Sequence, residues 1–259
     1  DHRDLHSFPT RRSSDLVSIA SNGDILVSSY ANLGQMRFSP DGELVGQWKK
    51  ADGLTGEKVR VGIESARTHD IYIGTTSGLN IVKADSGEVK SFTTSNGLAH
   101  NYIMAIYEDA TTGKIWLGTD GGGVVVMEGE RFTEHYTTEN GLAGNIVFKI
   151  SKDDDGAFWI CTGTGVSRLY NGKFDNFTKS SGMGTDSVFQ MIEDRAKNAW
   201  FVSNAGVSSV KKQDMIDMAN GKSTHIVPKF YTRFDGLKTI GVTSTALSMI
   251  DSRGQLWFT

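Results

Sequence analysis

The side chains that could do chemistry are scattered along this chain and show no spacing typical of catalysis. Of the histidines, His2 and His6 lie in an unusual N-terminal segment, and none of the other four has zinc-ligand spacing: His69, His100, His135 and His225. No Gly-x-Ser-x-Gly nucleophile motif occurs, and one sequence does not place two carboxylates across a site. We therefore predict no catalytic residue, no metal site and no cofactor.

Three further patterns have a simple structural interpretation. The acidic turn Asp153–Gly156 has the oxygen-rich composition of calcium loops, but it lacks the distal glutamate of a helix-loop-helix site, so a solvated turn is the preferred alternative. Residues 118–123 are rich in glycine, yet neither a helix nor the lysine of a phosphate-binding loop follows them. Cys161 lies in an apolar run and is predicted to be a buried small hydrophobe rather than a nucleophile.

The composition bounds the class of protein. The chain has 259 residues, of which 38% are hydrophobic and 22% are charged, as in ordinary globular domains. Its net charge is −3 and its lysines and arginines are dispersed, which argues against nucleic acid or an acidic membrane surface as a partner. No apolar run approaches the roughly 18 residues of a membrane span. We expect any leader or membrane segment to lie outside this stretch.

The first residues have a composition of their own. Residues 6–16 read like the in-frame translation of a sequencing-adapter oligonucleotide. We interpret residues 1–16 as an adapter-like artefact or disordered leader, the alternative being a natural polar linker.

Two independent markers repeat along the chain with nearly the same step. The first is a glycine followed by Leu or Met, with spacings of 44, 44, 41 and 54 residues: Gly53, Gly97, Gly141, Gly182 and Gly236. The second is an aromatic residue inside an apolar run, with spacings of 44, 43, 41 and 57: Tyr72, Trp116, Trp159, Trp200 and Trp257. A period of this size indicates tandem structural repeats.

Each repeat predicts four short strands. In one unit we place them at 102–107, 115–119, 124–127 and 131–137, and in the next at 145–150, 157–162, 166–170 and 173–178. Several of these strands are apolar on both faces, which requires sheets packed on either side. A β-propeller meets this requirement, with each aromatic residue buried as a wedge between neighbouring blades and each turn glycine supplying a positive φ.

The fold class predicted is all-β, an incomplete propeller of four-stranded antiparallel blades. We place about five blades and part of a sixth at 17–54, 55–98, 99–142, 143–183, 184–237 and 238–259. The fifth carries an insertion at 211–228, in which residues 213–221 are predicted to form a short helix that ends at Asn-Gly and covers a blade surface with its methionines. An unclosed arc leaves edge strands exposed, so we expect it to associate.

The repeat resembles the two-component regulator propeller family. The residues that carry the resemblance are Asn96-Gly97-Leu98, Asn101, Glu108-Asp109, Gly113–Thr119 and Gly122–Val124. The resemblance implies the extracytoplasmic sensor of a bacterial membrane receptor, periplasmic and membrane-tethered, followed by a β-sandwich module and a histidine kinase or other output module. Many members respond to oligosaccharides. The second unit departs from the pattern, with Arg60 and Val61 where an Asn and the start of the inner strand are expected.

Propeller geometry then selects candidate binding residues. The loops that enter the inner strands and those that join second to third strands share one face over the central channel, where ligands usually bind. The residues at these positions are His100, Asn101, Asp120, Asn145, Thr164, Asp186 and Asn204. Asn101, Asn145 and Asp186 hold the same place in successive units, so their amide and carboxylate groups could surround the channel and suit sugar hydroxyls. In the preferred alternative these three residues hydrogen-bond their own turns.

Three functions fit these features. The first is a ligand-sensing, non-enzymatic receptor segment whose partners are a small molecule or oligosaccharide, the remaining propeller blades and β-sandwich module of the same receptor, and a second copy of that receptor. The second is a propeller enzyme, a lyase or glycosidase, which two converging carboxylates with shifted pKa values would favour. The third is a protein-interaction scaffold, which a flat apolar channel face would favour.

Overall fold

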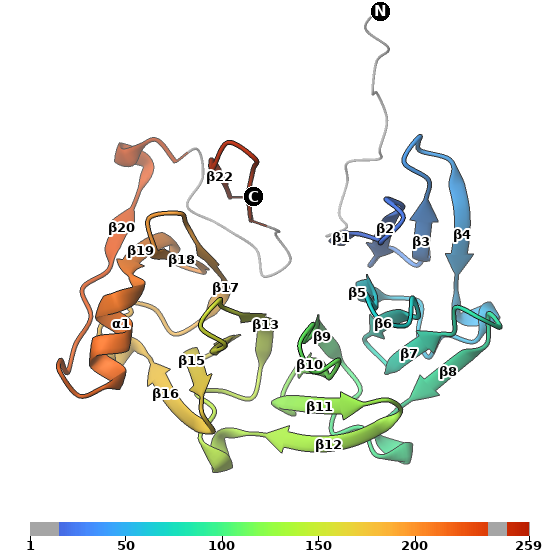
Figure 1. The fold of residues 1–259 in the computed structure, drawn as a ribbon, viewed down its shortest axis with the longest axis horizontal. Helices are drawn as coiled ribbons and strands as arrows, with labels where there is room; N and C mark the ends of the chain where they lie inside the picture. Colours follow the sequence, from blue (N-terminus) through green and yellow to red (C-terminus); the bar gives the residue numbers. More distant parts are fainter. Residues whose placement is uncertain (1–15, 238–247, 259) are drawn as a thin grey trace, which may run out of the picture.

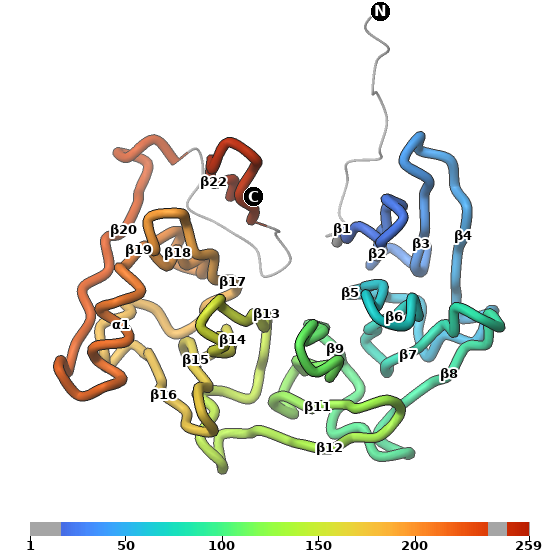
Figure 2. Tube along the Cα trace, in the orientation of Figure 1, coloured from blue at the N-terminus to red at the C-terminus, as the bar shows by residue number. Residues whose placement is uncertain are grey.

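A computed structural model describes residues 16–237 and 248–258 and shows four-stranded sheets arranged around a common centre (Figure 1). The prediction for residues 1–16 falls almost wholly outside the described residues. In each sheet the strands follow chain order and pair antiparallel, because short turns join consecutive strands. The tube in Figure 2 shows the same arc, in which the first and last described segments do not meet. The predicted propeller architecture is confirmed.

The blades have the following strands. Blade 1 contains β1 (Leu16–Ile19), β2 (Ile25–Ser29), β3 (Gly34–Phe38) and β4 (Leu44–Trp48). Blade 2 contains β5 (Val59–Glu64), β6 (Ile71–Thr75), β7 (Leu79–Val82) and β8 (Val89–Phe92). Blade 3 contains β9 (Ile103–Glu108), β10 (Ile115–Thr119), β11 (Val124–Glu128) and β12 (Arg131–Tyr136).

The second half of the arc repeats this order. Blade 4 contains β13 (Val147–Lys152), β14 (Phe158–Thr162), β15 (Gly165–Tyr170) and β16 (Lys173–Phe177). Blade 5 contains β17 (Val188–Glu193), β18 (Asn198–Ser203), β19 (Gly206–Lys211) and β20 (Lys229–Tyr231). A last sheet pairs β21 (Met249–Ile250) with β22 (Leu256–Trp257). Inner strands β5, β9, β13 and β17 face the centre in Figure 1, and the outer strands lie along the periphery of the arc.

The repeated aromatic residue seals the groove between one blade and the next. Tyr72, Trp116 and Trp159 are buried, and each packs in a separate apolar cluster with the following blade. Trp200 is half-buried between the rings of Tyr231 and Phe258. The prediction is wrong for Trp257, which is 55% exposed on the last, two-stranded sheet, since no further described blade covers it.

The repeated Gly-Leu turns have the predicted conformation. Each glycine ends a single turn of 3₁₀ helix with φ between +94° and +112°, a region that favours glycine. The residue after it is buried in four of the turns: Leu54, Leu98, Leu142 and Met183. The outer strand of the following blade covers the turn, as Phe132 covers Gly97 and Phe174 covers Gly141.

The insertion in blade 5 forms the predicted helix. It begins one residue before the predicted range 213–221 and ends two residues before the end of that range. Helix α1 (Lys212–Ala219) ends at Asn220 and lies beside β19 of blade 5 and β16 of blade 4 (Figure 1). Met215 is buried in the cluster between blades 4 and 5, and Met218 packs against it. The methionines therefore cover a blade surface, as predicted. Within the described part of the chain, no helix is long and apolar enough to cross a membrane.

Candidate ligand-binding face

One rim of the arc holds the beginnings of the inner strands together with the loops that join second to third strands; we call it the channel face. Here the inner strands share a β-bulge, in which one extra residue faces a regular partner strand, as register shifts in four blades show. The bulged residues are Arg60, Met104, Phe148 and Phe189. Bulges redirect a side chain and occur often beside binding sites. The rings of Phe148 and Phe189 meet edge to face at 5.1 Å.

The strand pairing corrects one prediction about the second repeat. Arg60 is equivalent to Met104, not to Asn101, because both follow the first paired residue of their inner strands. The residue three positions after Leu54, as Asn101 is three after Leu98, is Glu57, which is exposed. Counting from the turn rather than from the apparent strand start would have found this alignment.

Asn101 and Asn145 hold equivalent places and make equivalent hydrogen bonds. The Oδ1 of Asn101 accepts from the Thr94 N–H at 2.8 Å, and the Oδ1 of Asn145 accepts from the Thr138 N–H at 2.9 Å. Each bond satisfies a free N–H at the start of a 3₁₀ turn. The preferred alternative, that these residues hydrogen-bond their own turns, is thus what the structure shows, and a ligand contact by them stays a prediction.

His100, Asp120 and Asn145 are brought together where blade 3 meets blade 4. The N–H groups of Gly121 and Gly123 donate to the Asn145 carbonyl at 3.1 and 2.9 Å, so the loop after β10 rests on the head of the next inner strand. His100 packs closely over this loop, since a Cβ on Gly122 would lie 2.6 Å from the His100 Cβ. The glycine-rich stretch is therefore a close-packed turn, as predicted.

The other candidates lie further along the same face. The Asn204 Oδ1 accepts a 2.7 Å hydrogen bond from the Thr185 hydroxyl, and the Thr164 hydroxyl donates to the Ala143 carbonyl. Thr164, Asp186 and Asn204 are exposed. These three side chains belong to the loops of blades 4 and 5, away from the His100 group.

A second cluster on this face was missed from the sequence. Tyr30, after β2, shares a hydrogen bond with Tyr102 at the head of β9, and the Lys58 Nζ lies 5.2 Å from the centre of the Tyr30 ring. Arg60 is only 7% exposed, and the nearby Tyr102, Tyr30 and Asp120 partly offset the lowering of its pKa by burial. Burial and the bond to Tyr30 raise the pKa of Tyr102 to about 12, so its hydroxyl stays neutral.

The signal for this cluster was present in the chain. Tyr30 directly follows β2, as Asp120 follows β10 and Asn204 follows β18, so the rule that selected those two residues also selects Tyr30. The cluster joins three blades and combines two phenol rings, a guanidinium and a carboxylate. Such groups can stack on and hydrogen-bond a polar ring-shaped ligand.

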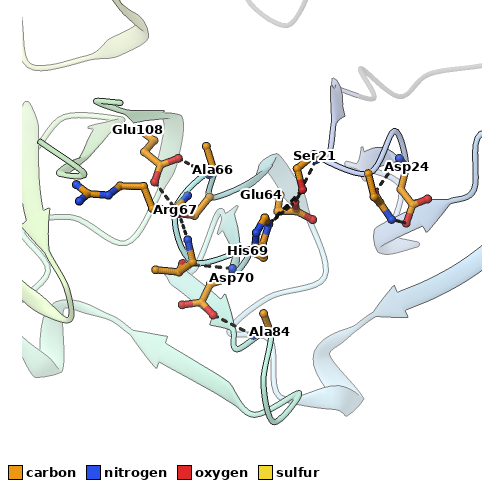
Figure 3. Close-up of polar contacts among 12 residues, drawn as sticks. Ser21, Asp24, Glu64, Ala66, Arg67, His69, Asp70, Ala84 and Glu108 are labelled. Atoms are coloured by element: carbon orange, nitrogen blue, oxygen red, sulfur yellow. Dashed lines mark hydrogen bonds and ion pairs between the residues drawn. The ribbon is translucent and has the colours of Figure 1, made fainter. Parts of the chain in front are cut away.

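The opposite rim holds the turns between first and second strands; we call it the turn face. Figure 3 shows its contacts between blades 1, 2 and 3. Glu64 accepts hydrogen bonds from the N–H and hydroxyl of Ser21, at 3.1 and 2.6 Å. One repeat later, Glu108 accepts from the Ser65 hydroxyl and the Ala66 N–H, both at 2.6 Å. A glutamate at the end of one inner strand thus ties down the turn of the preceding blade.

The acidic turn 153–156 also has a structural role. The Asp153 carboxylate accepts from the Trp159 indole N–H at 2.8 Å and from Lys212 Nζ at 3.1 Å, and Lys212 also contacts Asp155 and Glu193. The ammonium group of Lys212, the first residue of α1, thus neutralises the Asp153 carboxylate. Asp194 and Trp200 repeat the bond to the indole at 2.8 Å. Asp154 is 93% exposed.

The thiol and several carboxyl groups that catalysis could use are buried or hydrogen-bonded within the protein, and the described residues hold no group of metal ligands. Burial raises the pKa of the Cys161 thiol to about 12, as expected for an apolar side chain rather than a nucleophile. Hydrogen bonds outweigh burial and lower the carboxyl pKa values of the turn-face residues Asp70, Asp109 and Asp194. Across residues 16–237 and 248–258, no three His, Cys, Asp or Glu side chains are grouped as metal ligands.

Comparison with known proteins gives one family model that matches a short segment and several structures of similar fold. The family model described as two component regulator propeller matches residues 97–121. No curated protein sequence matches the chain. The extracellular domain of BT3049 from B. thetaiotaomicron, assigned to the hybrid two component systems, has a TM-score of 0.75 and 20% identity over 94% of this chain. The chain spans only 32% of that structure.

Other similar structures have different functions. A catalytically inactive virginiamycin B lyase from Staphylococcus aureus, solved with quinupristin, has a TM-score of 0.67 and 12% identity, covering 97% of this chain and 85% of its own. PorZ, a surface component of the type-IX secretion system of Porphyromonas gingivalis, has a TM-score of 0.65 and 13% identity, covering 94% and 36%. At these identities the likeness shows a shared fold alone.

Proposed function

We propose that this chain, which carries a two component regulator propeller repeat and has the fold of the extracellular domains of such sensors, recognises a small polar ligand without catalysis. The ligand class that suits its channel face best is an oligosaccharide. The chain would then be part of the extracytoplasmic, membrane-tethered sensor of a bacterial two-component receptor. Further blades and a β-sandwich module would complete this receptor, and a second copy could pair with it.

The observation that carries this proposal is the group of Tyr30, Arg60, Tyr102 and Asp120. It draws on the heads of two inner strands and the loops of two blades, so it is a product of the propeller arrangement and not of one local turn. The phenol rings offer apolar faces with polar edges, and the charged groups offer donors and acceptors in planes suited to vicinal hydroxyls. A ligand that bridges several blades can shift how they pack, which is how a binding event would become a signal.

The test is a binding screen of the folded chain against neutral and acidic oligosaccharides, followed by calorimetry on the best ligand. Tyr102→Phe and Tyr30→Phe each remove one hydroxyl, and we expect each to weaken binding about tenfold, as loss of a buried hydrogen bond does. Tyr170→Phe is the matched control, because Tyr170 is 37% exposed at the end of β15, outside the cluster. Equal affinity in all three variants would reject this cluster as the site.

A further inference from the structure

A cavity of about 400 Å³ lies in the groove between blades 1 and 2, on the turn face. Its size is in the lower part of the range for small-molecule sites. Its walls come from the outer part of blade 1, notably Arg37 and Trp48, and from the start of β6 and the end of β7 in blade 2, with Ser21, Asn22, Glu64 and His69 at one side. The cavity lies on the other rim from the channel-face cluster and does not depend on the function proposed there.

The cavity has an origin in the repeat. Leu26 of β2 pairs with Ser18 and Arg37, just as Trp159 of β14 pairs with Ser151 and Arg168. Blade 1 therefore has the register of blade 4 with a leucine where the aromatic wedge stands. Leu26 is fully buried in the cluster of its groove but is much smaller than an indole. Leu26 shares this cluster with Ile71 and Val82, which line the cavity, so we attribute the open space in the groove to the smaller side chain.

The charged side chains around the cavity are two cations and three carboxylates. The Arg37 Nε lies 2.6 Å from Asp24 Oδ2 and its Nη2 lies 3.3 Å from Glu64 Oε2, and the Lys83 Nζ lies 2.5 Å from Asp70 Oδ2, so carboxylates neutralise both cations and no positive charge is left over for an anionic ligand. The guanidinium, the ammonium, Ser21, Asn22 and His69 give the lining donors and acceptors. The Glu64 side chain is 3% exposed and its oxygens contact Ser21, His69 and Arg37, so it holds these groups in place. A half-buried tryptophan, Trp48, and the apolar side chains of Ile71 and Val82 form the rest of the lining.

His69 lies at the edge of the cavity in a left-handed backbone conformation, with φ +60°. The equivalent positions hold glycines with positive φ in four sheets, Gly23, Gly113, Gly156 and Gly254, and Lys197 with φ +60° in blade 5. The side-chain contacts of His69, and not its backbone conformation, therefore distinguish this place. The His69 Nδ1 lies 3.1 Å from the Ser21 hydroxyl and 3.2 Å from Glu64 Oε1, so the imidazole spans the boundary between the two blades (Figure 3).

From this geometry we propose that the cavity binds a single uncharged polyol ring of monosaccharide size. The aromatic wall matches the apolar face of such a ring, and the donors and acceptors of the lining match its hydroxyls. The Ser21, His69 and Glu64 group is a binding element and not a catalytic triad. In a triad the imidazole uses one nitrogen for the serine and the other for the acid, whereas here Nδ1 faces both partners.

The experiment uses saturation-transfer NMR and calorimetry with D-glucose, D-galactose and D-mannose, and with D-glucuronate as the charged comparison. We expect at least one neutral sugar to bind and glucuronate to bind about tenfold more weakly. His69→Gly restores the residue that the turn prefers, so it should fold, yet it should weaken sugar binding about tenfold. Leu26→Trp restores the wedge of the repeat and should abolish binding.

Two control variants show whether a loss of sugar binding comes from this cavity. One tests the effect of relieving a left-handed backbone conformation elsewhere, and the other tests the effect of changing the channel face. Lys197→Gly relieves the same left-handed conformation in blade 5, where φ is +60°, and should leave binding unchanged. Tyr102→Phe should also leave it unchanged, although it weakens the channel-face ligand. The proposal is overturned if no neutral sugar binds, if glucuronate binds better than all of them, or if His69→Gly and Leu26→Trp, with wild-type thermal stability, bind as the wild type does.

Discussion

The hydroxyl of Ser65 in blade 2 donates a hydrogen bond of 2.6 Å to Glu108 at the end of the inner strand of blade 3. The residues are separated by 43 positions, about one repeat, and Ser21 and Glu64 make the same contact one repeat earlier. Since the same glutamate also accepts from the Ala66 N–H, it joins two neighbouring blades at their turns.

Removing the Glu108 carboxylate should lower the stability of the fold. Glu108→Ala leaves the Ser65 hydroxyl and the Ala66 N–H without their acceptor, and we expect it to lower the free energy of unfolding by about 1–3 kcal/mol. Urea unfolding measures the change, and a double-mutant cycle with Ser65→Ala isolates the shared bond. Strict additivity of the two single changes would show that the contact contributes nothing. Glu128→Ala, at an exposed strand end, is the control.

Lys212 should be the most sensitive charged residue of the arc. Its side chain is 5% exposed, and its ammonium contacts Asp153 of blade 4 and Glu193 of blade 5. Lys212→Met keeps the length of the side chain but leaves a nearly buried Asp153 without its cation, which should lower the free energy of unfolding by about 3–5 kcal/mol. Lys222→Met, which breaks an exposed ion pair with Asp217, should change it by less than about 1 kcal/mol. Similar losses in the two variants would contradict this.

Replacing an aromatic wedge should lower the free energy of unfolding more where a described blade covers the ring than where none does. Trp159 is 1% exposed and stacks on Phe177, so Trp159→Ala should lower the free energy of unfolding by about 3–5 kcal/mol. Trp257 holds the same repeat position but is 55% exposed, so Trp257→Ala should have a much smaller effect. Thermal and urea unfolding of both variants give the comparison, and equal losses would show that the wedges do not act between blades.

Acid should destabilise the turn face. Burial alone would raise the pKa of Asp70, but hydrogen bonds from Lys83 and the Ala84 N–H outweigh it and hold that pKa below its ordinary value. The unfolded chain therefore binds this proton more tightly, so the stabilisation is complete above about pH 4 and is lost as pH falls through the folded-state pKa. In urea unfolding at a series of pH values, Asp70→Asn should be less stable than wild type at neutral pH and lose less stability on acidification. An unchanged acid dependence would contradict this assignment.

The sequence predicted the features that are local and repeated. The Gly-Leu turns, the strands around Trp116 and Trp159, and the helix in the blade 5 insertion need only neighbouring residues, so spacing and turn chemistry were enough. The ends of most predicted strands in blades 3 and 4 lie within two residues of the observed ones. The glutamates that contact the turn of the preceding blade, Glu64 and Glu108, are also about one repeat apart. In the sequence, Glu108 was identified only as part of the family motif.

What the sequence did not predict depends on register between strands and between blades. Arg60 was aligned with an asparagine because the strand was counted from its apparent start and not from the preceding Gly-Leu turn, and the strand pairs show that Arg60 is equivalent to Met104. The contact of Tyr30 with Tyr102 joins blades 1 and 3 across the head of blade 2, a distance in sequence that no local rule covers. The cavity between blades 1 and 2 is lined by residues from both blades, and the equivalence of Leu26 to the wedge rests on its strand pairs with Ser18 and Arg37.

The most direct test of ligand recognition at the channel face is hydrogen–deuterium exchange of the chain with and without the tightest oligosaccharide from the screen. We predict slower exchange at residues 57–61 and 99–104 and in the loop 120–123, with little change in outer strands β8, β12 and β16. Protection confined to the outer strands, or no protection at saturating ligand, would contradict the account.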